Sequence, residues 1–365
     1  MLYYLADYEN FFGPLRLFRY LSFRCLMAFC FAAFIGFLIA PYAIDILHKI
    51  KFGQAFRTKE QVGKLAELHA AKKGTPTMGG IIIFFALVIS AVLWAQLNTL
   101  VLVSLFVYVS FTILGFADDF LKIKRKSSEG VHGKVKLLVQ LVVSLACVFV
   151  LVNSQYEGVV RDLYAPFIKG PIISNMPIWA LCAFFFLVIS GASNAINLTD
   201  GVDGLAIGCT ISSTLAYGVF AYVAGNAIAA NYLFLPAING CGELCVVCAA
   251  LVGASMAFLW HNAYPAAVFM GDTGSLALGG LIGTMAILTA QPLTLVIVGG
   301  VFVMETVSVM MQVSSYKLCG KRIFRCTPIH HHFEYGGWKE TQVVIRFWII
   351  SLAFALMGIA TLKFR

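Results

Sequence analysis

Residues 100–125 read LVLVSLFVYVSFTILGFADDFLKIKR. The run from 100 to 117 is uncharged and mostly apolar, which suits a helix that crosses a membrane, because such a helix needs about 20 largely apolar residues. Asp118 and Asp119 follow directly, and three basic residues lie within the next six positions. The stretch therefore predicts a transmembrane helix that delivers two adjacent carboxylates to one membrane face.

The composition of the whole chain extends this prediction. Of 365 residues, 60% are hydrophobic and 12% are charged, whereas a soluble domain carries about 25% charged residues. This is too little charge to cover a water-soluble globule, so we expect one membrane-embedded domain over residues 1–365. The net charge of +9 is explained by basic loops that face anionic lipid, and we expect no nucleic-acid partner.

Nine further apolar runs have a similar length and composition. The ten predicted spans cover roughly 21–44, 78–97, 100–117, 134–152, 176–193, 205–224, 244–260, 275–290, 293–315 and 343–362. The eighth is the weakest because it is short and rich in glycine. The predicted fold class is all-α: a polytopic integral membrane protein with about ten transmembrane helices, an even number that places both termini on one side.

The distribution of Lys and Arg predicts which side is cytoplasmic. Five alternate segments share one face by parity and carry eighteen basic residues, while the opposite face, including both termini, carries seven. Cytoplasmic loops are the more basic ones in membrane proteins. Arg16, Arg19 and Arg24 oppose this rule locally, but the overall asymmetry predicts periplasmic termini and cytoplasmic long loops.

The acids at the end of the 100–117 run favour a metal. A helix C-terminus carries partial negative charge and disfavours carboxylates, and adjacent acids repel each other. Both costs fall away if Mg²⁺ binds, since this ion takes one or two carboxylates together with substrate phosphate oxygens. The alternative is a solvated pair neutralised by Lys122, Lys124 and Arg125.

Two further loops fall on the same predicted face. The loop 194–204 contains Asn197, Asp200 and Asp203 and has no Lys or Arg; its amides and acids suit hydrogen bonds to a ribose or a base, although Asp203 could simply cap the next helix. In the other loop, Asp272 lies between glycines that permit close approach to a phosphate. A capping role for Asp272 is the alternative.

The remaining polar stretches leave more than one interpretation open. The stretch 72–80, with Lys72 and Thr77, makes an anion site or a basic membrane anchor. Three successive histidines, 330–332, cannot all face one way, and we favour contact with a pyrophosphate over zinc. Glu305 lies inside a predicted span, where an acid is functional or bonds a neighbouring helix. Cys241, Cys245 and Cys248 have a spacing that can hold an iron–sulfur cluster, but helix packing is favoured.

Five motifs give the chain a close resemblance to a known family. They are GTPTMGG (74–80), GFADDF (115–120), NLTDGVDGL (197–205), VFMGDTGS (268–275) and TPIHHHFE (327–334). The chain resembles the phospho-N-acetylmuramoyl-pentapeptide-transferase family of the polyprenyl-phosphate N-acetylhexosamine-1-phosphate transferase superfamily. The resemblance covers essentially the whole chain, and no motif departs from the pattern.

The resemblance implies an Mg²⁺-dependent homodimer in the bacterial cytoplasmic (inner) membrane, with its active site on the cytoplasmic face. It would join UDP-N-acetylmuramoyl-pentapeptide to undecaprenyl phosphate, a membrane lipid, giving lipid I and UMP. Asp118, Asp119 and Asp272 would be catalytic, with Asp272 and Asp118 holding the metal. The expected substrate-binding residues are Lys72, Thr77, Lys122, Lys134, Asn197, Asp200, Gly201, Asp203, Asn262, Phe269, His330, His331 and His332.

Two other functions fit part of the pattern. A sister transferase that uses UDP-N-acetylglucosamine would share the paired acids, but the run from His330 to Glu334 argues against it. A cation-coupled transporter would also bury acids among ten spans. Transporters bind near the bilayer midplane at paired broken helices, whereas these acids, apart from Glu305, are predicted at one face.

Overall fold

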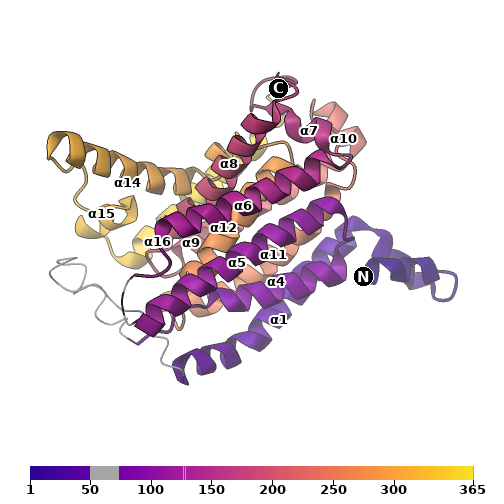
Figure 1. Ribbon diagram of the computed structural model, residues 1–365. Coiled ribbons are helices and arrows are strands. Elements are labelled where there is room, and N and C mark those ends of the chain that lie inside the picture. Colours follow the sequence, from indigo (N-terminus) through magenta and orange to yellow (C-terminus); the bar gives the residue numbers. More distant parts are fainter. Residues whose placement is uncertain (50–73, 126, 128, 365) are drawn as a thin grey trace.

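The computed structural model describes residues 1–49, 74–125, 127 and 129–364, and these residues are predominantly helical (Figure 1). The long helices are α1 (Leu21–Lys49), α4 (Gly80–Trp94), α5 (Thr99–Arg125), α6 (Gly133–Val152), α8 (Ile178–Thr199), α9 (Leu205–Ala224), α11 (Gly242–Asn262), α12 (Gly271–Leu288), α14 (Gly300–Cys319) and α16 (Glu340–Ala360). The short elements are η1 (Leu2–Tyr8), η2 (Gly13–Arg19), α7 (Glu157–Arg161), α10 (Ala227–Tyr232), α13 (Leu295–Val298), α15 (Ile329–Tyr335), and the strands β1 (Leu163–Tyr164) and β2 (Pro171–Ile173), which pair antiparallel.

The predicted fold class is confirmed: the chain is an all-α, multi-pass membrane protein. Within the described residues, eight helices are long and apolar enough to cross a membrane. The predicted span 78–97 corresponds to α4, which is shorter at 15 residues. The predicted span 293–315 is divided at Gly299 into α13 and α14. Ten spans therefore remain a prediction.

The helix α12, which the sequence marked as the weakest span, lies at the centre of the bundle. Its apolar window is 89% buried, against 28% for α1. It packs against α5 and α8, while α11 lies between α1 and α9 (Figure 1). The glycines of α12 explain why it is the weakest span in the sequence, because small residues lower its hydropathy. They also explain its central position, because small residues let neighbouring helices approach closely.

Glycine contacts fix three helices at the N-terminal end of α12. A Cβ atom added to Gly115 of α5 would lie 2.1 Å from the Asp272 carbonyl oxygen, and one added to Gly80 of α4 would lie 2.3 Å from the Gly274 nitrogen. The Gly80 N–H donates to the Met270 carbonyl at 3.0 Å. Backbone contact at these distances excludes any side chain, so the two glycines bring α4 and α5 directly onto the start of α12.

The opposite end of the bundle carries a buried ion pair. Arg24 of α1 and Glu243 of α11 meet through two contacts, Nη1–Oε2 at 2.5 Å and Nη2–Oε1 at 2.6 Å, and both residues are buried. The Arg24 guanidinium also lies over the Tyr3 ring. Arg24 opposed the basic asymmetry in the sequence because it is a packing residue, matched by an acid from another helix. The N-terminal segment lies at this end (Figure 1).

Candidate active site

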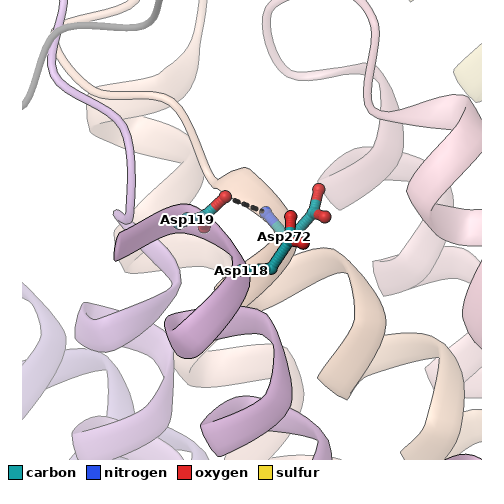
Figure 2. A group of neighbouring side chains, drawn as sticks. All are labelled: Asp118, Asp119 and Asp272. Atoms are coloured by element: carbon teal, nitrogen blue, oxygen red, sulfur yellow. Dashed lines mark hydrogen bonds between the residues drawn. The ribbon is translucent and has the colours of Figure 1, made fainter. Parts of the chain in front are cut away.

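Three aspartates from two helices meet at one point. Asp118 and Asp119 lie near the end of α5, and Asp272 lies in the first turn of α12. One carboxylate oxygen from each lies within 4.8 Å of the others, and Figure 2 shows the three side chains converging. The sequence placed these acids on one predicted face from separate segments, and the fold brings them into a single cluster.

Asp119 is held by the N-terminus of α12. Its carboxylate accepts hydrogen bonds from the Asp272 N–H at 3.2 Å and the Thr273 N–H at 2.9 Å, and from the Thr273 hydroxyl at 2.7 Å. A helix N-terminus has unpaired N–H groups and partial positive charge, which stabilise a carboxylate. Asp119, a buried residue, therefore docks α5 onto α12 and fixes the position of Asp272.

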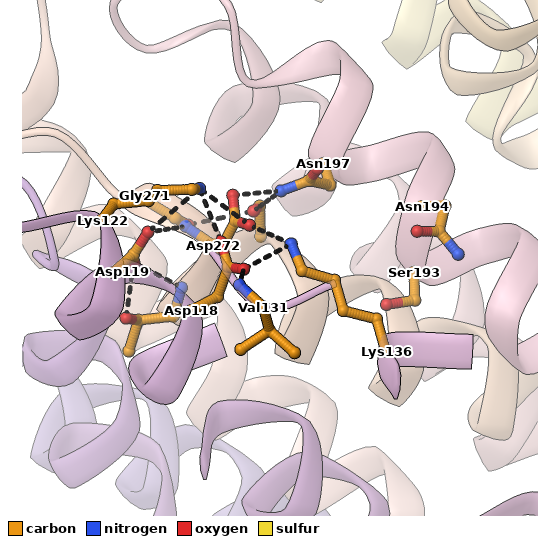
Figure 3. A network of polar contacts seen from close by, with 12 residues as sticks. Asp118, Asp119, Lys122, Val131, Lys136, Ser193, Asn194, Asn197, Gly271 and Asp272 are labelled. Atoms are coloured by element: carbon orange, nitrogen blue, oxygen red, sulfur yellow. Dashed lines mark hydrogen bonds and ion pairs between the residues drawn. The ribbon is translucent and has the colours of Figure 1, made fainter. Parts of the chain in front are cut away.

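Asp118 and Asp272 share two lysine side chains (Figure 3). The Lys122 Nζ lies 2.6 Å from Asp118 Oδ2 and 3.1 Å from Asp272 Oδ2. The Lys136 Nζ lies 2.9 Å from Asp118 Oδ1 and 2.8 Å from Asp272 Oδ2. Three carboxylates against two ammonium groups leave a formal charge of −1, so among these five side chains the cluster is short of one positive charge.

Two residues of the 194–204 loop region approach Asp272 from the side. The Asn197 amide donates to Asp272 Oδ1 at 2.8 Å and to the Ser275 hydroxyl at 2.8 Å. Asp200 is the residue at the C-terminal end of α8. Burial, reinforced by the nearby carboxylates of Asp272 and Asp119, raises the pKa of Asp200 to about 8.

Several other predicted site residues hold the loops around the cluster. Asp203 accepts a hydrogen bond from the Ala266 N–H at 3.1 Å. The Asn262 side chain accepts from the Gly204 N–H at 3.1 Å and donates to the Val268 carbonyl at 2.8 Å. These two buried residues connect the loop after α8 to the loop before α12. They therefore have a structural role in addition to the substrate contact expected for them.

Thr77 and Phe269 lie on two paired strand-like segments. The Phe269 N–H donates to the Pro76 carbonyl at 2.8 Å, and the Gly79 N–H donates to the Phe269 carbonyl at 2.8 Å. Thr77 is buried, and its hydroxyl oxygen is 2.7 Å from the position of a Cβ on Gly271. Phe269 is half-buried. The stretch before α4 is thereby anchored beside Asp272.

The three successive histidines have three different environments, as their spacing predicted. His330 is fully buried with its Nδ1 3.1 Å from Glu305 Oε2. The His331 Nδ1 lies 2.6 Å from Glu334 Oε2, and burial lowers the pKa of His331 although that carboxylate acts in the opposite direction. The His332 Nδ1 accepts from the Arg325 N–H at 3.2 Å.

The cationic residues of the site differ from those expected from the sequence. Lys122 lies in the cluster, Lys134 is exposed on α6, and Lys72 falls outside the described residues. Lys136, which sequence reasoning missed, reaches the acids instead. A signal was available: Lys136 is one helical turn before Gln140, a buried amide that bonds the Ser193 hydroxyl of α8, so both mark the face of α6 that points into the protein.

The oxygen-rich trio is suited to a hard divalent cation. In the part of the chain that the structure describes, it is the only group of three or more potential metal-ligating side chains. Carboxylate oxygens are the ligands of Mg²⁺ and Ca²⁺, and the missing positive charge of the cluster favours a cation. The Cys241 and Cys248 side chains are buried in the apolar core, and their packing role stays a prediction.

The sequence matches known families over most of its length. The profile described as Glycosyl transferase family 4 matches residues 99–290, and the phospho-N-acetylmuramoyl-pentapeptide-transferase signature 1 matches residues 72–84. The phospho-N-acetylmuramoyl-pentapeptide-transferase of Opitutus terrae is 49% identical to the chain over 100% of both sequences. That of Methylacidiphilum infernorum is 47% identical over 100% of both, and that of Maridesulfovibrio salexigens is 48% identical over 97% of this chain and 96% of the relative.

The matched regions include every part of the cluster. The family profile covers both helices that supply the three aspartates, and the signature covers the stretch that anchors beside Asp272. The relatives are nearly half identical to the chain over its full length, so the comparison includes the fold and all the residues of the cluster. The chain therefore belongs to Glycosyl transferase family 4 and, within it, to the phospho-N-acetylmuramoyl-pentapeptide-transferase family.

Proposed function

We propose that the enzyme transfers phospho-N-acetylmuramoyl-pentapeptide from UDP-N-acetylmuramoyl-pentapeptide to undecaprenyl phosphate, giving lipid I and UMP. The observation that carries this proposal is the cluster of Asp118, Asp119 and Asp272 with two lysines at the end of membrane helices. Such a cluster can hold a pyrophosphate and a lipid phosphate together. The names of the full-length relatives support the choice of substrates.

Asp272 and Asp118 are the proposed ligands of Mg²⁺. The bound ion would neutralise charge that develops on the UMP leaving group. Lys122 and Lys136 each contact both carboxylates, and their ammonium groups can turn to the substrate phosphates when the carboxylates take a cation. Asn197 keeps Asp272 in place through its amide, so the residues around the ion are arranged before the substrate arrives.

The two adjacent acids have different proposed roles. Both carboxylate oxygens of Asp119 are engaged at the start of α12, which suits a residue that positions Asp272. Asp118 faces both lysines and is the better candidate for the base that removes a proton from undecaprenyl phosphate. A deprotonated lipid phosphate is itself a nucleophile, so the base route needs no covalent enzyme intermediate.

Exchange of labelled UMP distinguishes the base from a covalent nucleophile. If Asp118 is a base, label should enter UDP-N-acetylmuramoyl-pentapeptide only when the lipid is present, and the loss of activity in Asp118→Asn should be partly offset at higher pH. Exchange in rigorously delipidated protein, abolished by the same substitution, would instead show a covalent intermediate on this residue.

The remaining predicted residues have proposed roles in substrate binding. Phe269 would stack on uracil, and Lys72, Thr77, Asn197, Asp200, Gly201, Asp203 and Asn262 would line the nucleoside side of the pocket. Lys122, Lys134, His331 and His332 would face the pyrophosphate and the sugar, while the fully buried His330, expected there from the resemblance, would act from beneath the loop. These roles follow from the family resemblance, and the position of the loops beside Asp272 supports them.

We further propose a homodimer in the bacterial inner membrane, with ten spans, periplasmic termini and the cluster at the cytoplasmic face. The basic asymmetry of the sequence supports this orientation. In a cysteine-free background, a cysteine replacing the exposed Glu129 should react only from the cytoplasm, and one replacing the exposed Lys169 only from outside. Reversed labelling would invert the orientation, and a monomeric mass in mild detergent would exclude the dimer.

Release of UMP by purified protein is the direct test of the proposed function. The protein is incubated with UDP-N-acetylmuramoyl-pentapeptide, undecaprenyl phosphate and Mg²⁺, and reactions lacking each component serve as controls. UMP release that requires all three supports the proposal. Equal or faster release from UDP-N-acetylglucosamine would show the sister transferase, and absence of release with ion-dependent solute uptake in vesicles would show a transporter.

A further inference from the structure

Glu305 and His330 form a buried pair, and Glu305 has no role in the steps above. Glu305 lies on α14 and His330 on α15, and neither side chain is exposed. The His330 Nδ1 is 3.1 Å from Glu305 Oε2, and the His330 backbone N–H donates to the same oxygen at 3.4 Å. An isolated buried carboxylate is costly; among the described residues, His330 is the ion-pair partner of Glu305.

The other edge of the His330 ring faces the loop that carries Asp200. A Cβ atom added to Gly201 would lie 2.4 Å from His330 Nε2 and 2.8 Å from Cε1. Gly201 itself is exposed on its other side. The ring therefore lies between Glu305 on one side and the Gly201 backbone on the other, and only a residue without a side chain fits at position 201.

We propose that Glu305 is a positioning residue of this active site, acting through His330 to hold the loop from Asp200 to Gly204 against the cluster. The Glu305 carboxylate accepts the His330 backbone N–H and lies at ion-pair distance from Nδ1, and these two contacts hold the imidazole in place. The opposite edge of the imidazole then supports the Gly201 backbone. Because Gly201 follows Asp200, the orientation of the ring sets where the Asp200 carboxylate lies relative to Asp272.

Burial separates His330 from its neighbour His331. His330 is 0% exposed and neither of its ring nitrogens makes a hydrogen bond with the described residues, the Nδ1 contact with Glu305 being an ion-pair distance, so its ring packs under the loop and does not face the substrate space. The His331 side chain is 17% exposed and its ring lies 4.1 Å from that of His330. His331 is therefore the histidine placed to touch substrate, and His330 is a support.

A suppression experiment tests the contact between the ring and the loop. Gly201→Ala in the full-length enzyme should lower kcat by roughly tenfold, because the methyl group meets the ring. In a His330→Ala background the same substitution should cost less than about twofold, since the ring is gone. Equal losses in both backgrounds, or a harmless Gly201→Ala, would overturn the proposal.

A second set of variants tests the role of Glu305. Glu305→Gln keeps an oxygen that can accept the His330 backbone N–H and should keep kcat within about threefold of the wild type, while Glu305→Leu should lower it roughly tenfold with little change in KM for the nucleotide. In the His330→Ala background, Glu305→Leu should have almost no further effect on kcat. The matched control is Ser308→Ala, which removes a buried hydroxyl bonded to the Glu305 carbonyl on the same helix without touching His330.

Thermal unfolding of the same variants separates this inference from the proposed function on which its kinetic readout rests. A purely structural Glu305 would lower the melting temperature in Glu305→Leu and leave the kcat of folded enzyme unchanged, which would overturn the proposal. If the wild type released no UMP, the proposed function would fail. Coupling between positions 201 and 330 would then be read from melting temperatures, and additive shifts there would overturn the contact as well.

Discussion

The two ends of the bundle handle buried charge in opposite ways. At one end, Arg24 and Glu243 form a matched pair with two short contacts, and the Gln96 N–H satisfies Glu243 further at 2.8 Å. At the other end, three aspartates meet two lysines. Glu243 and Asp272 lie at opposite ends of the core, since α11 and α12 each extend about 30 Å along it.

The difference separates a structural ion pair from a site that can bind a ligand. One acid and one base in direct contact balance each other's charge and need no further ion. An excess of acid remains costly until a cation or a change of protonation relieves it. Charge balance, more than burial alone, therefore distinguishes the two ends, and the following variants are designed to alter that balance.

The largest effect is expected for Asp272→Asn. The amide keeps the size of the side chain and balances the cluster at two acids and two lysines, so the demand for a cation is lost. Activity should fall at least about 100-fold at any Mg²⁺ concentration, as when an active site loses one electrostatic group. UMP release across a magnesium titration measures this, and near-normal turnover would mean that Asp272 only begins α12.

Removing one partner of the other pair should affect stability and leave chemistry intact. Glu243→Leu leaves the Arg24 guanidinium buried and unpaired, which should lower the free energy of unfolding by about 3–5 kcal/mol. Replacing both residues with Leu should recover much of this loss, because two apolar groups fit the packing. Thermal unfolding and kcat of the folded fraction are the measurements. A fall in kcat equal to that of Asp272→Asn would contradict a purely structural role for the Arg24–Glu243 pair.

Lys136 and Lys134 offer a matched pair on one helix. Lys136→Ala removes an ammonium group that contacts Asp118 and Asp272 and should lower kcat/KM by roughly tenfold to 100-fold. Lys134→Ala removes an exposed ammonium group two residues away and should have a smaller effect. Steady-state UMP release measures kcat/KM for both variants. An equal loss in the two would support the substrate contact that was expected for Lys134.

A pH-dependent effect on stability is expected from Asp200 in the metal-free enzyme. The pKa of its carboxyl is about 8 in the folded protein and about 3.9 in an unfolded chain, so the folded state binds the extra proton between these values. Stability from this group is therefore complete at low pH and is lost as the pH rises through about 8. The melting temperature of Asp200→Asn relative to the wild type should rise between about pH 5 and about pH 9; a constant difference would contradict the raised pKa.

The sequence by itself determined the fold class and pointed to the three aspartates that the fold brings together. Long uncharged runs are stable in lipid, where each backbone N–H and C=O group needs a hydrogen bond within the protein. A helix supplies these bonds within one segment, so such runs predict membrane helices. Asp118 and Asp119 stood out because a helix C-terminus disfavours carboxylates, and Asp272 stood out because it lies between glycines that permit close approach to a phosphate. The non-equivalence of Asp118 and Asp119 was also predictable, since neighbouring helical residues point about 100° apart.

Only the tertiary structure decided which partner each charged group has. For Lys134 and Lys136 the sequence offers no more than the one-turn spacing from Lys136 to Gln140, and the rotation of α6 against α8 puts Lys136 among the acids. Arg24 looked like an exception to the basic asymmetry until α11 placed Glu243 beside it. Glu305 and His330 are 25 residues apart and gained their contact when α15 folded back onto α14. Pairing across helices depends on helix rotation and approach, which packing sets and local sequence does not encode.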